Sequence, residues 1–256
     1  MMHIYAADDH IMFITDTINA DFHRHSFMQL SISLQSAFII KTSEKQFPCR
    51  GIVIDSNTDH YFDGNQNLLL FLLIDHTSGI AKQLRQTLLR NENSYILPDE
   101  IIEKIALLIN RDMHSINDTN YFELLSKILT TLGLQDFESN TTDGRISKII
   151  EQLRSCTQSD HSIKQLAESV FLSPSRLSHL FKQYTGVSLN TYIVHHKLQK
   201  ALFHIFNGTA ITDAAMLAGF DSPSHLAATS KRLLGMSAKE IRKDSVFLKV
   251  SRYQSL

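Results

Sequence analysis

The chain has 256 residues, a hydrophobic content of 43% and a formal net charge of −1. This length and composition predict about two domains with packed cores. With two cysteines, Cys49 and Cys156, the sequence excludes a zinc finger or a disulfide framework and favours a reduced, cytoplasmic setting. The longest apolar run, residues 68–74, is too short to cross a bilayer, and the N-terminal residues show no signal-peptide pattern, so we expect no membrane partner.

Residues 1–80 are predicted to form β-structure. Short apolar runs at residues 27–34, 38–40, 51–54 and 68–74 are separated by polar turns such as Asp63-Gly64-Asn65. Short strands at this spacing are typical of a β-sandwich or a small barrel.

Residues 81–136 are predicted to be helical, because apolar residues recur there at helical spacing. Pro98 is placed to begin one helix, and another is predicted over residues 120–132. The apolar faces of these two helices exceed what a small barrel needs, so we expect a dimer interface or packing between domains. The polar stretch at residues 137–144 predicts a linker.

Residues 162–188 and 210–237 have nearly the same sequence. Ile163 matches Ile211, Ala167 matches Ala215, and after one inserted residue a Ser-Pro-Ser triplet recurs. Each copy predicts a short helix, a tight turn and a second helix opened by Ser-Pro, which is the helix-turn-helix pattern. A helix over residues 188–206, about 28 Å long, would join the copies. Successive major-groove segments on one DNA face lie about 34 Å apart.

The charge distribution agrees with DNA binding by the C-terminal half. Residues 145–256 carry 15 Lys+Arg and 7 Asp+Glu, a net charge of +8. Residues 1–144 carry 10 Lys+Arg and 19 Asp+Glu, a net charge of −9. A basic half beside an acidic half indicates that the basic half binds a polyanion.

Within the first copy, Ser162 and Gln165 predict a capping box, and Ser173 is predicted to cap the next helix. Leu177, Leu180, Phe181 and Tyr184 are predicted to face the core. The opposite face is predicted to contact DNA through base edges or phosphates. It carries Ser175, Ser178 and His179 toward bases, Arg176 and Lys182 toward phosphates, and also Gln183.

The second copy carries Ser224, His225 and Lys231 on the matching polar face. It has Thr229-Ser230 where the first copy has Leu180-Phe181. We therefore expect a looser core there and fewer base contacts.

Residues 145–243 resemble the AraC/XylS family of bacterial transcription regulators. The resemblance rests on Leu166-Ala167, on Ser173-Pro174-Ser175-Arg176-Leu177, and on Gly219-Phe220 with the closing Gly235-Met236-Ser237. It implies DNA-facing positions in the second copy at Ser222, Ser224, His225, Ala228 and Lys231. It also implies a sequence-specific regulator that acts as an activator, binds double-stranded DNA and contacts RNA polymerase.

The implied fold class is α+β. A cupin-like barrel at residues 1–80 with dimerisation-type helices at 81–136 and a linker at 137–144 would precede an all-α domain at 145–256. That last domain holds the two helix-turn-helix units and their linker helix. The resemblance further implies a small-molecule effector and a homodimer.

His23 and His25 would share one face if they lay on a strand, with Gln29 further along that face. With His60 they would form a cluster of a kind that suits transition metals. Glutamine is a poor substitute for a carboxylate ligand, so we assign no metal and no cofactor. The favoured interpretation is an effector pocket lined by His25, Gln29 and His60, with Phe38 and Phe71 as walls.

Two other functions stay open from the sequence. One is a metal-dependent cupin enzyme with an appended helical domain, although we expect no enzyme because of the duplicated basic unit. The other is a ligand-independent regulator controlled by a protein partner.

Overall fold

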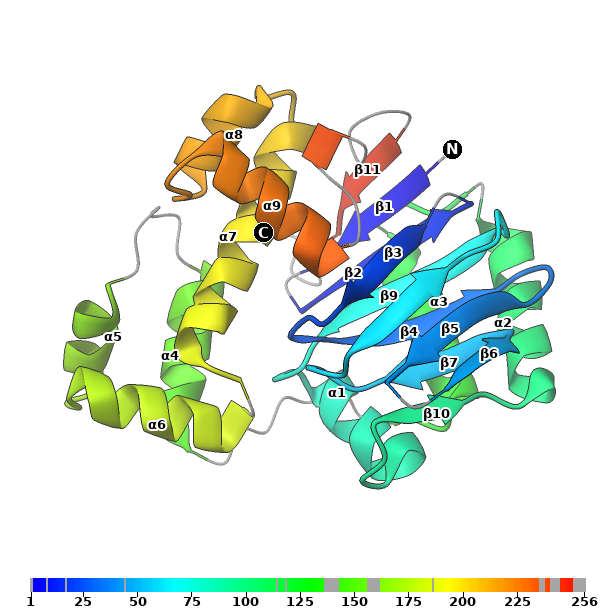
Figure 1. Cartoon of the computed structure of the whole chain (residues 1–256), viewed down its shortest axis with the longest axis horizontal. Helices are drawn as coiled ribbons and strands as arrows, with labels where there is room; N and C mark the ends of the chain where they lie inside the picture. Colours follow the sequence, from blue (N-terminus) through cyan, green and yellow to red (C-terminus); the bar gives the residue numbers. More distant parts are fainter. Residues whose placement is uncertain are drawn as a thin grey trace. The chain divides into compact units, whose positions relative to one another are not determined.

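The computed structural model describes residues 2–135 except 8, 17, 44, 114 and 118, and then residues 143–155, 162–185, 187–234, 238–239 and 245–250. These residues form two compact units (Figure 1). The first contains two sheets with the helices that follow them, and the second is built on the helices from residue 144 onward. Most of the linker predicted at 137–144 lies outside the described residues, as do Cys156, Gly186 and the closing residues 235–237.

The first unit holds a seven-stranded sheet and a four-stranded sheet. The larger has the order β10-β7-β4-β9-β2-β1-β11 and the smaller the order β3-β8-β5-β6. All pairings are antiparallel except that of β11 with β1, which is parallel. The strands are β1 (Met2–Ala6), β2 (His10–Thr15), β3 (Asn19–His23), β4 (Phe27–Ser33), β5 (Phe38–Thr42), β6 (Gln46–Cys49), β7 (Gly51–Ile54), β8 (His60–Asp63), β9 (Leu69–Asp75), β10 (Ser94–Ile96) and β11 (Ser245–Lys249).

The larger sheet is buried on both faces, which explains its weak sequence alternation. On β4, Met28 and Leu30 belong to the core that the helices share, whereas Gln29 on the other face bonds to His60 of the smaller sheet. Every residue of β4 and of β9 is buried. A strand covered on both sides needs apolar residues at successive positions, as a two-faced buried sheet requires.

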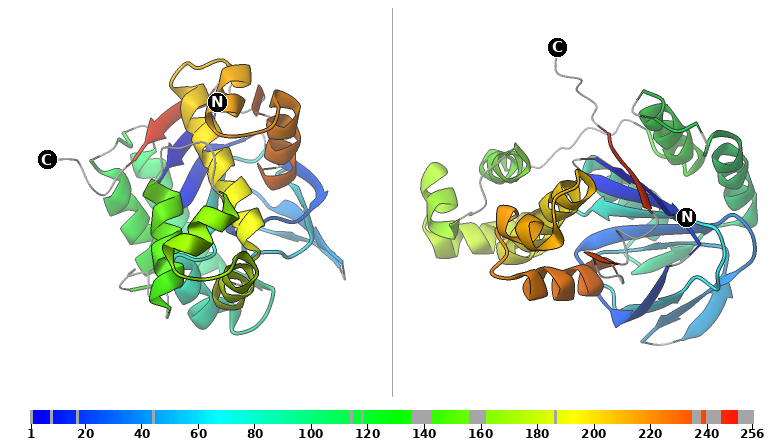
Figure 2. Two further views of the ribbon diagram at one scale, coloured as in Figure 1. Left: turned by 90° about the vertical axis from the view of Figure 1, so that its left-hand side faces the viewer. Right: turned by 90° about the horizontal axis from the view of Figure 1, so that it is seen from above.

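Three helices and a π-helical segment cover the larger sheet on the face away from the smaller sheet (Figure 2). They are α1 (Gly79–Leu84), the π-helical Arg85–Leu89, α2 (Asp99–Asp112) and α3 (Tyr121–Thr131). Pro98 precedes α2 as predicted. The apolar faces that suggested a dimer or domain interface are instead buried in this core, although Leu107 of α2 is 70% exposed.

A hydrogen-bonded chain of polar side chains ties α3 to the sheet. The Nε2 atom of His10 on β2 lies 2.7 Å from the Tyr121 hydroxyl, and its Nδ1 lies 2.7 Å from an oxygen of Asp9. His10 and Tyr121 are fully buried. Burying polar groups is tolerated here because each finds a partner.

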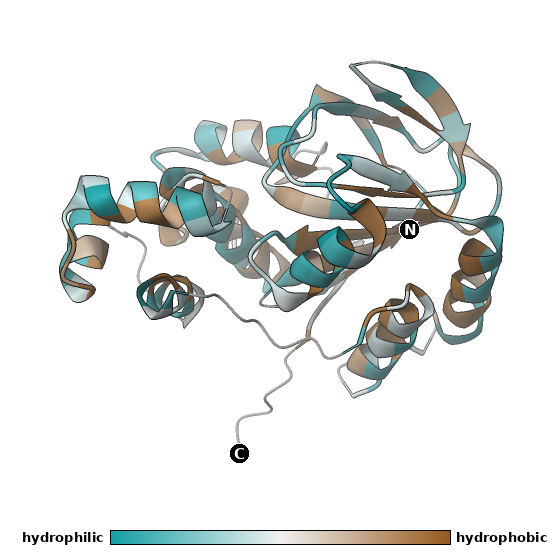
Figure 3. Cartoon of the chain, turned by 90° about the horizontal axis from the view of Figure 1, so that it is seen from below, coloured by the Kyte–Doolittle hydropathy of each residue, from teal (hydrophilic) through white to brown (hydrophobic). Residues whose placement is uncertain are grey.

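Among the residues that the structure describes, the second unit includes helices α4 to α9, each with both hydrophilic and hydrophobic residues (Figure 3). They are α4 (Gly144–Ser155), α5 (Ile163–Ser169), α6 (Pro174–Thr185), α7 (Leu189–Phe206), α8 (Ile211–Leu217) and α9 (Pro223–Leu234). Helices α4 to α7 share one core that includes Ile149, Leu166, Phe181 and Tyr192. The predicted linker helix is α7, and the Ser188 hydroxyl caps it by accepting from the Thr191 amide at 3.1 Å.

Two local expectations in this unit were wrong. Ser162 precedes α5 but makes no side-chain cap bond, so the capping box does not form. Tyr184 is 41% exposed and does not face the core.

The C-terminal segment departs most from the expected architecture. Residues 145–256 were expected to form a wholly helical domain, but Ser245–Lys249 form β11 on the edge of the first unit's sheet. Five register pairs join β11 to β1, from Met2↔Ser245 to Ala6↔Lys249. An exposed sheet edge offers unpaired backbone groups to any extended segment that reaches it.

Candidate DNA interface and effector site

The turns of the two helix-turn-helix units have the same backbone geometry. Phe171 and Gly219 occupy equivalent positions and both adopt left-handed conformations, with φ of 56° and 81°. In each unit the next amide returns to the preceding helix, Leu172 to the Ala167 carbonyl and Phe220 to the Ala215 carbonyl, both at 2.9 Å. The repeat seen in the sequence is therefore also a repeat of structure.

The recognition helices α6 and α9 also begin in the same way. The Ser173 hydroxyl accepts from the Arg176 amide at 3.2 Å, and the Ser222 hydroxyl accepts from the His225 amide at 3.1 Å. A proline is the first residue of each helix. These bonds satisfy amides that the first helical turn leaves without a partner.

Helix α6 presents one apolar and one polar face. Leu177, Leu180 and Phe181 are buried. Ser178 is half-buried, and its hydroxyl donates to the Pro174 carbonyl at 2.9 Å. The exposed face carries Ser175, Arg176, His179, Lys182 and Gln183.

Helix α9 has the same division with fewer functional groups. Thr229 and Ser230 are buried where α6 has Leu180 and Phe181. Ser222 is half-buried at the cap, whereas Ser224, His225, Ala228 and Lys231 are exposed.

Asp221, the residue inserted in the second copy, changes the chemistry at the start of α9. One of its oxygens lies 3.1 Å from Nδ1 of His225. The pairing holds the imidazole beside an exposed carboxylate, which repels a phosphate. Helix α6 has no residue at the equivalent position.

Helix α7 connects the two helix-turn-helix units and contacts the turn of the second one directly. The Lys197 ammonium donates to the Gly219 carbonyl at 2.6 Å. A cation at the end of α8 is favoured by the helix dipole. The 18 residues of α7 extend about 27 Å.

The interior between the two sheets is lined by aromatic rings. The ring centroid of Phe62 lies 4.9 Å from that of Phe38 and 5.4 Å from that of Phe71. The two predicted walls are thus brought together by Phe62, a residue that the sequence analysis did not single out. Its position two residues after His60, on the same strand face, was the available signal.

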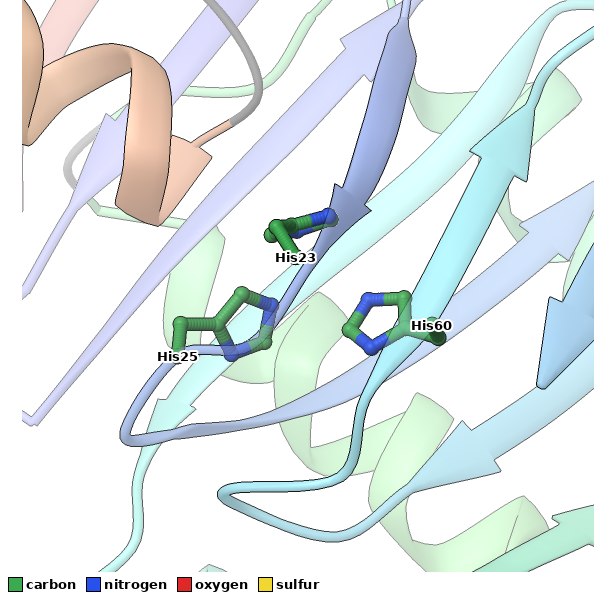
Figure 4. Close-up of side chains that lie close together, drawn as sticks. All are labelled: His23, His25 and His60. Atoms are coloured by element: carbon green, nitrogen blue, oxygen red, sulfur yellow. The ribbon is translucent and has the colours of Figure 1, made fainter. Parts of the chain in front are cut away.

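The predicted polar residues His25, Gln29 and His60 do meet, and Figure 4 shows the two histidines. Oε1 of Gln29 lies 3.1 Å from Nε2 of each histidine. All three side chains are buried. Nε2 of Gln29 donates to the Ser31 hydroxyl at 3.0 Å, which adds Ser31 to the set.

His23 lies beside this cluster, but for a different structural reason than the sequence predicted. It is the last residue of β3, whereas His25 lies in the connection to β4, so the two do not share a strand face. His23 and His60 are instead cross-strand partners, with ring centroids 4.5 Å apart. Directly paired residues of antiparallel strands lie on one face, which explains the proximity.

Burial keeps the imidazoles neutral. It lowers the pKa of His25 to about 3, with further lowering from the neighbouring His60 and His23. Burial and then His23 lower the pKa of His60 to about 4. The cluster therefore offers nitrogen lone pairs at neutral pH.

Residues 145–244 match a protein family described as a helix-turn-helix domain. A probable transcriptional regulator, LumQ of Photobacterium leiognathi, is 24% identical over 241 residues, which cover 84% of this chain and 89% of LumQ. The match to LumQ therefore includes residues of both compact units, the sheet-containing one and the helical one. These matches support the expected resemblance to the AraC/XylS family.

The chain has a fold similar to that of ToxT of Vibrio cholerae. Against an apo ToxT variant the TM-score is 0.58 at 13% identity, covering 91% of this chain and 97% of the other. Against unsaturated fatty acid bound wild-type ToxT it is 0.55 at 12% identity, covering 91% and 93%. The expected α+β fold class is confirmed by this likeness, with the β-strands in two separate sheets.

The chain is a DNA-binding transcription regulator. Helix α9 adds an exposed cation, Arg232, that the sequence analysis did not assign and that directly follows Lys231. Of the helices that the structure describes, none has the length and apolar character to cross a membrane.

Proposed function

We propose that this AraC/XylS regulator reads DNA with the exposed faces of α6 and α9 and responds to a small molecule held between its two sheets. The observation that supports the DNA contacts most strongly is the matched pair of turns and serine caps. Because these features recur, both helices project from their units in the same manner. The proposed contacts are Ser175, Arg176, Ser178, His179, Lys182, Gln183, Ser222, Ser224, His225, Ala228 and Lys231.

The two recognition helices have unequal roles in this proposal. Helix α6 has His179 to meet base edges and the cations Arg176 and Lys182 to meet phosphates. Helix α9 has Ala228 in place of a long polar group and pairs His225 with Asp221. It therefore anchors the backbone and contributes less to sequence preference.

The small molecule is proposed to contact His25, Gln29 and His60 through a polar group, and Phe38 and Phe71 through an apolar part. The buried polar set beside the aromatic rings supports this division. ToxT, whose fold is similar, has been seen with a bound unsaturated fatty acid. In this chain the sheet interior acts by binding rather than by catalysis.

The wider assembly is also proposed. The regulator is an activator that forms a homodimer in the cytoplasm and contacts RNA polymerase. Residues 1–80 are the sensor, and residues 81–136 form the helical layer beside it. The DNA-binding domain begins near residue 145 and ends before β11.

Selection from genomic DNA tests the function directly. The purified full chain is incubated with sheared DNA of its source organism at about 150 mM salt, because lower salt allows non-specific retention. We expect a few promoter fragments that share one asymmetric motif. The selection is run with and without metabolites from a cell extract. If all fragments are retained equally in both cases, the chain is not a sequence-specific DNA reader.

Two substitutions distinguish contacts to base edges from contacts to phosphates. His179→Ala is expected to weaken binding to the selected motif by about 1–3 kcal/mol and to relax base preference. Lys182→Ala is expected to weaken binding to all sequences and to reduce the slope of affinity against salt by about one ion. Titrations by fluorescence anisotropy at several salt concentrations measure both, and exchanged phenotypes would reverse the two assignments.

A further inference from the structure

Three imidazole rings converge on one point inside the first unit (Figure 4). One ring nitrogen from each of His23, His25 and His60 lies within 4.8 Å of those of the other two. The rings come from the end of β3, from the connection to β4 and from the start of β8. Strand pairing and a short connection therefore fix all three positions.

Each of the three rings has its Nδ1 beside a backbone carbonyl. Nδ1 of His23 lies 2.7 Å from the Asp21 carbonyl, Nδ1 of His25 lies 3.1 Å from the Phe27 carbonyl, and Nδ1 of His60 lies 2.9 Å from the Thr58 carbonyl. A carbonyl only accepts, so the neutral rings of His25 and His60 carry their proton on Nδ1. The lone pair then belongs to Nε2. Metal-binding histidines are commonly oriented by such bonds from their other nitrogen.

The position of Gln29 gives a second, independent indication. Its Nε2 donates to Ser31, so its Oε1 faces the Nε2 lone pairs of His25 and His60 at 3.1 Å from each. The lone pairs of Gln29 Oε1, His25 Nε2 and His60 Nε2 then face one another. They repel unless a cation lies between them or the Gln29 amide is rotated by half a turn. A cation satisfies all of them without rotating the amide.

Although glutamine is a poor substitute for a carboxylate and the sequence led us to assign no metal, the convergence of the three rings changes this interpretation. We propose that His23, His25 and His60 bind a divalent transition-metal ion, with Oε1 of Gln29 facing the fourth position. Three neutral nitrogens and an amide oxygen suit ions of the zinc, cobalt and nickel type rather than magnesium or calcium. A tetrahedral zinc ion needs nitrogens about 3.4 Å apart, so the rings close inward by about an ångström on binding. The proposal refines the polar end of the proposed effector site but does not depend on DNA reading.

Cobalt(II) is the probe, because four-coordinate cobalt absorbs visible light far more strongly than the hydrated ion. The full-length protein, without a histidine tag and stripped with a chelator, is titrated with Co²⁺ at neutral pH. We expect one equivalent per chain with a four-coordinate spectrum. Zn²⁺ is expected to displace the cobalt and to raise the thermal midpoint of the chain.

Variants decide which residues hold the ion. His23→Ala is the main variant, because His23 is half-buried and its loss leaves the core intact. It is expected to weaken Co²⁺ binding by about 100-fold or more. The matched control is His225→Ala, an exposed histidine of the other unit, which is expected to leave the spectrum unchanged. Gln29→Glu, which adds a carboxylate, is expected to tighten binding by about 10-fold or more.

The proposal is overturned if the stripped chain binds no more Co²⁺ than His23→Ala does, or if the spectrum is that of the hydrated ion. The genomic selection is run in parallel on the same preparations. Promoter enrichment without Co²⁺ binding would reject the metal site alone. Co²⁺ binding without enrichment would retain the site and reject the proposed DNA-reading function.

Discussion

At the scale of the residue, Phe171 is the least expected side chain in the DNA-binding unit. It is 96% exposed and occupies a left-handed conformation that favours glycine. The second unit has Gly219 at the equivalent position. An L side chain there costs roughly 1–2 kcal/mol, and full exposure leaves no packing to offset that cost.

Phe171→Gly is therefore expected to stabilise the chain by about 1 kcal/mol, because relief of the backbone strain exceeds the added entropy of an unfolded glycine. Chemical denaturation followed by circular dichroism measures the change. Gly219→Ala is the reciprocal control and should destabilise the chain by a similar amount. If the Phe171→Gly variant is instead less stable, the aromatic ring makes stabilising contacts whose loss outweighs the relief of backbone strain.

At the scale of the element, the serine caps explain why the recognition helices were predictable. Ser173 and Ser222 each precede a proline, and the structure places a cap bond at both. These signals act over three residues, so the sequence alone contains them. At Ser162 the same local rule failed, because the hydroxyl makes no bond to the helix that follows it.

Ser173→Ala and Ser222→Ala are each expected to lower the free energy of unfolding by about 1 kcal/mol through loss of the cap. Ser162→Ala is the matched control, and we expect almost no change because its side chain has no cap bond to lose. Urea titration of the three variants measures the differences. Equal losses at all three positions would show that capping at α6 and α9 adds nothing specific.

At the scale of the whole molecule, the chain returns to its first strand. Strand β11 follows the DNA-binding helices in sequence and pairs with β1 in the first unit. The C-terminal segment is thus part of the sheet that forms the sensor. It covers an edge that would otherwise offer its backbone groups to another chain.

A chain ending at residue 244 is expected to melt at a lower temperature and to associate at high concentration, because the β1 edge is then open. Differential scanning calorimetry and light scattering measure the two effects. Removal of residues 251–256 alone is the control and should change neither. An unaltered melting curve after loss of β11 would mean that this pairing contributes no stability.

Local signals in the sequence determined the parts of this protein that repeat or that form within a few residues. They include the two helix-turn-helix units, the serine caps, the exposed face of α6 and the strands Phe27–Ser33, Phe38–Thr42, Gly51–Ile54 and Leu69–Asp75 of the first unit. Each depends on hydrophobic spacing or on a bond to a near neighbour, which any copy of that sequence would reproduce.

Tertiary structure decided what depends on residues far apart in the chain. His23 meets His60 only because β3 pairs with β8, and the connection between β3 and β4 carries His25 to the same point. The apolar faces of α2 and α3 are buried on the sheet rather than left for a partner, and Ser245–Lys249 find their partner at residues 2–6. No local pattern specifies which of several compatible surfaces an apolar face or an extended segment will contact, because that choice is made by the packing of the whole chain.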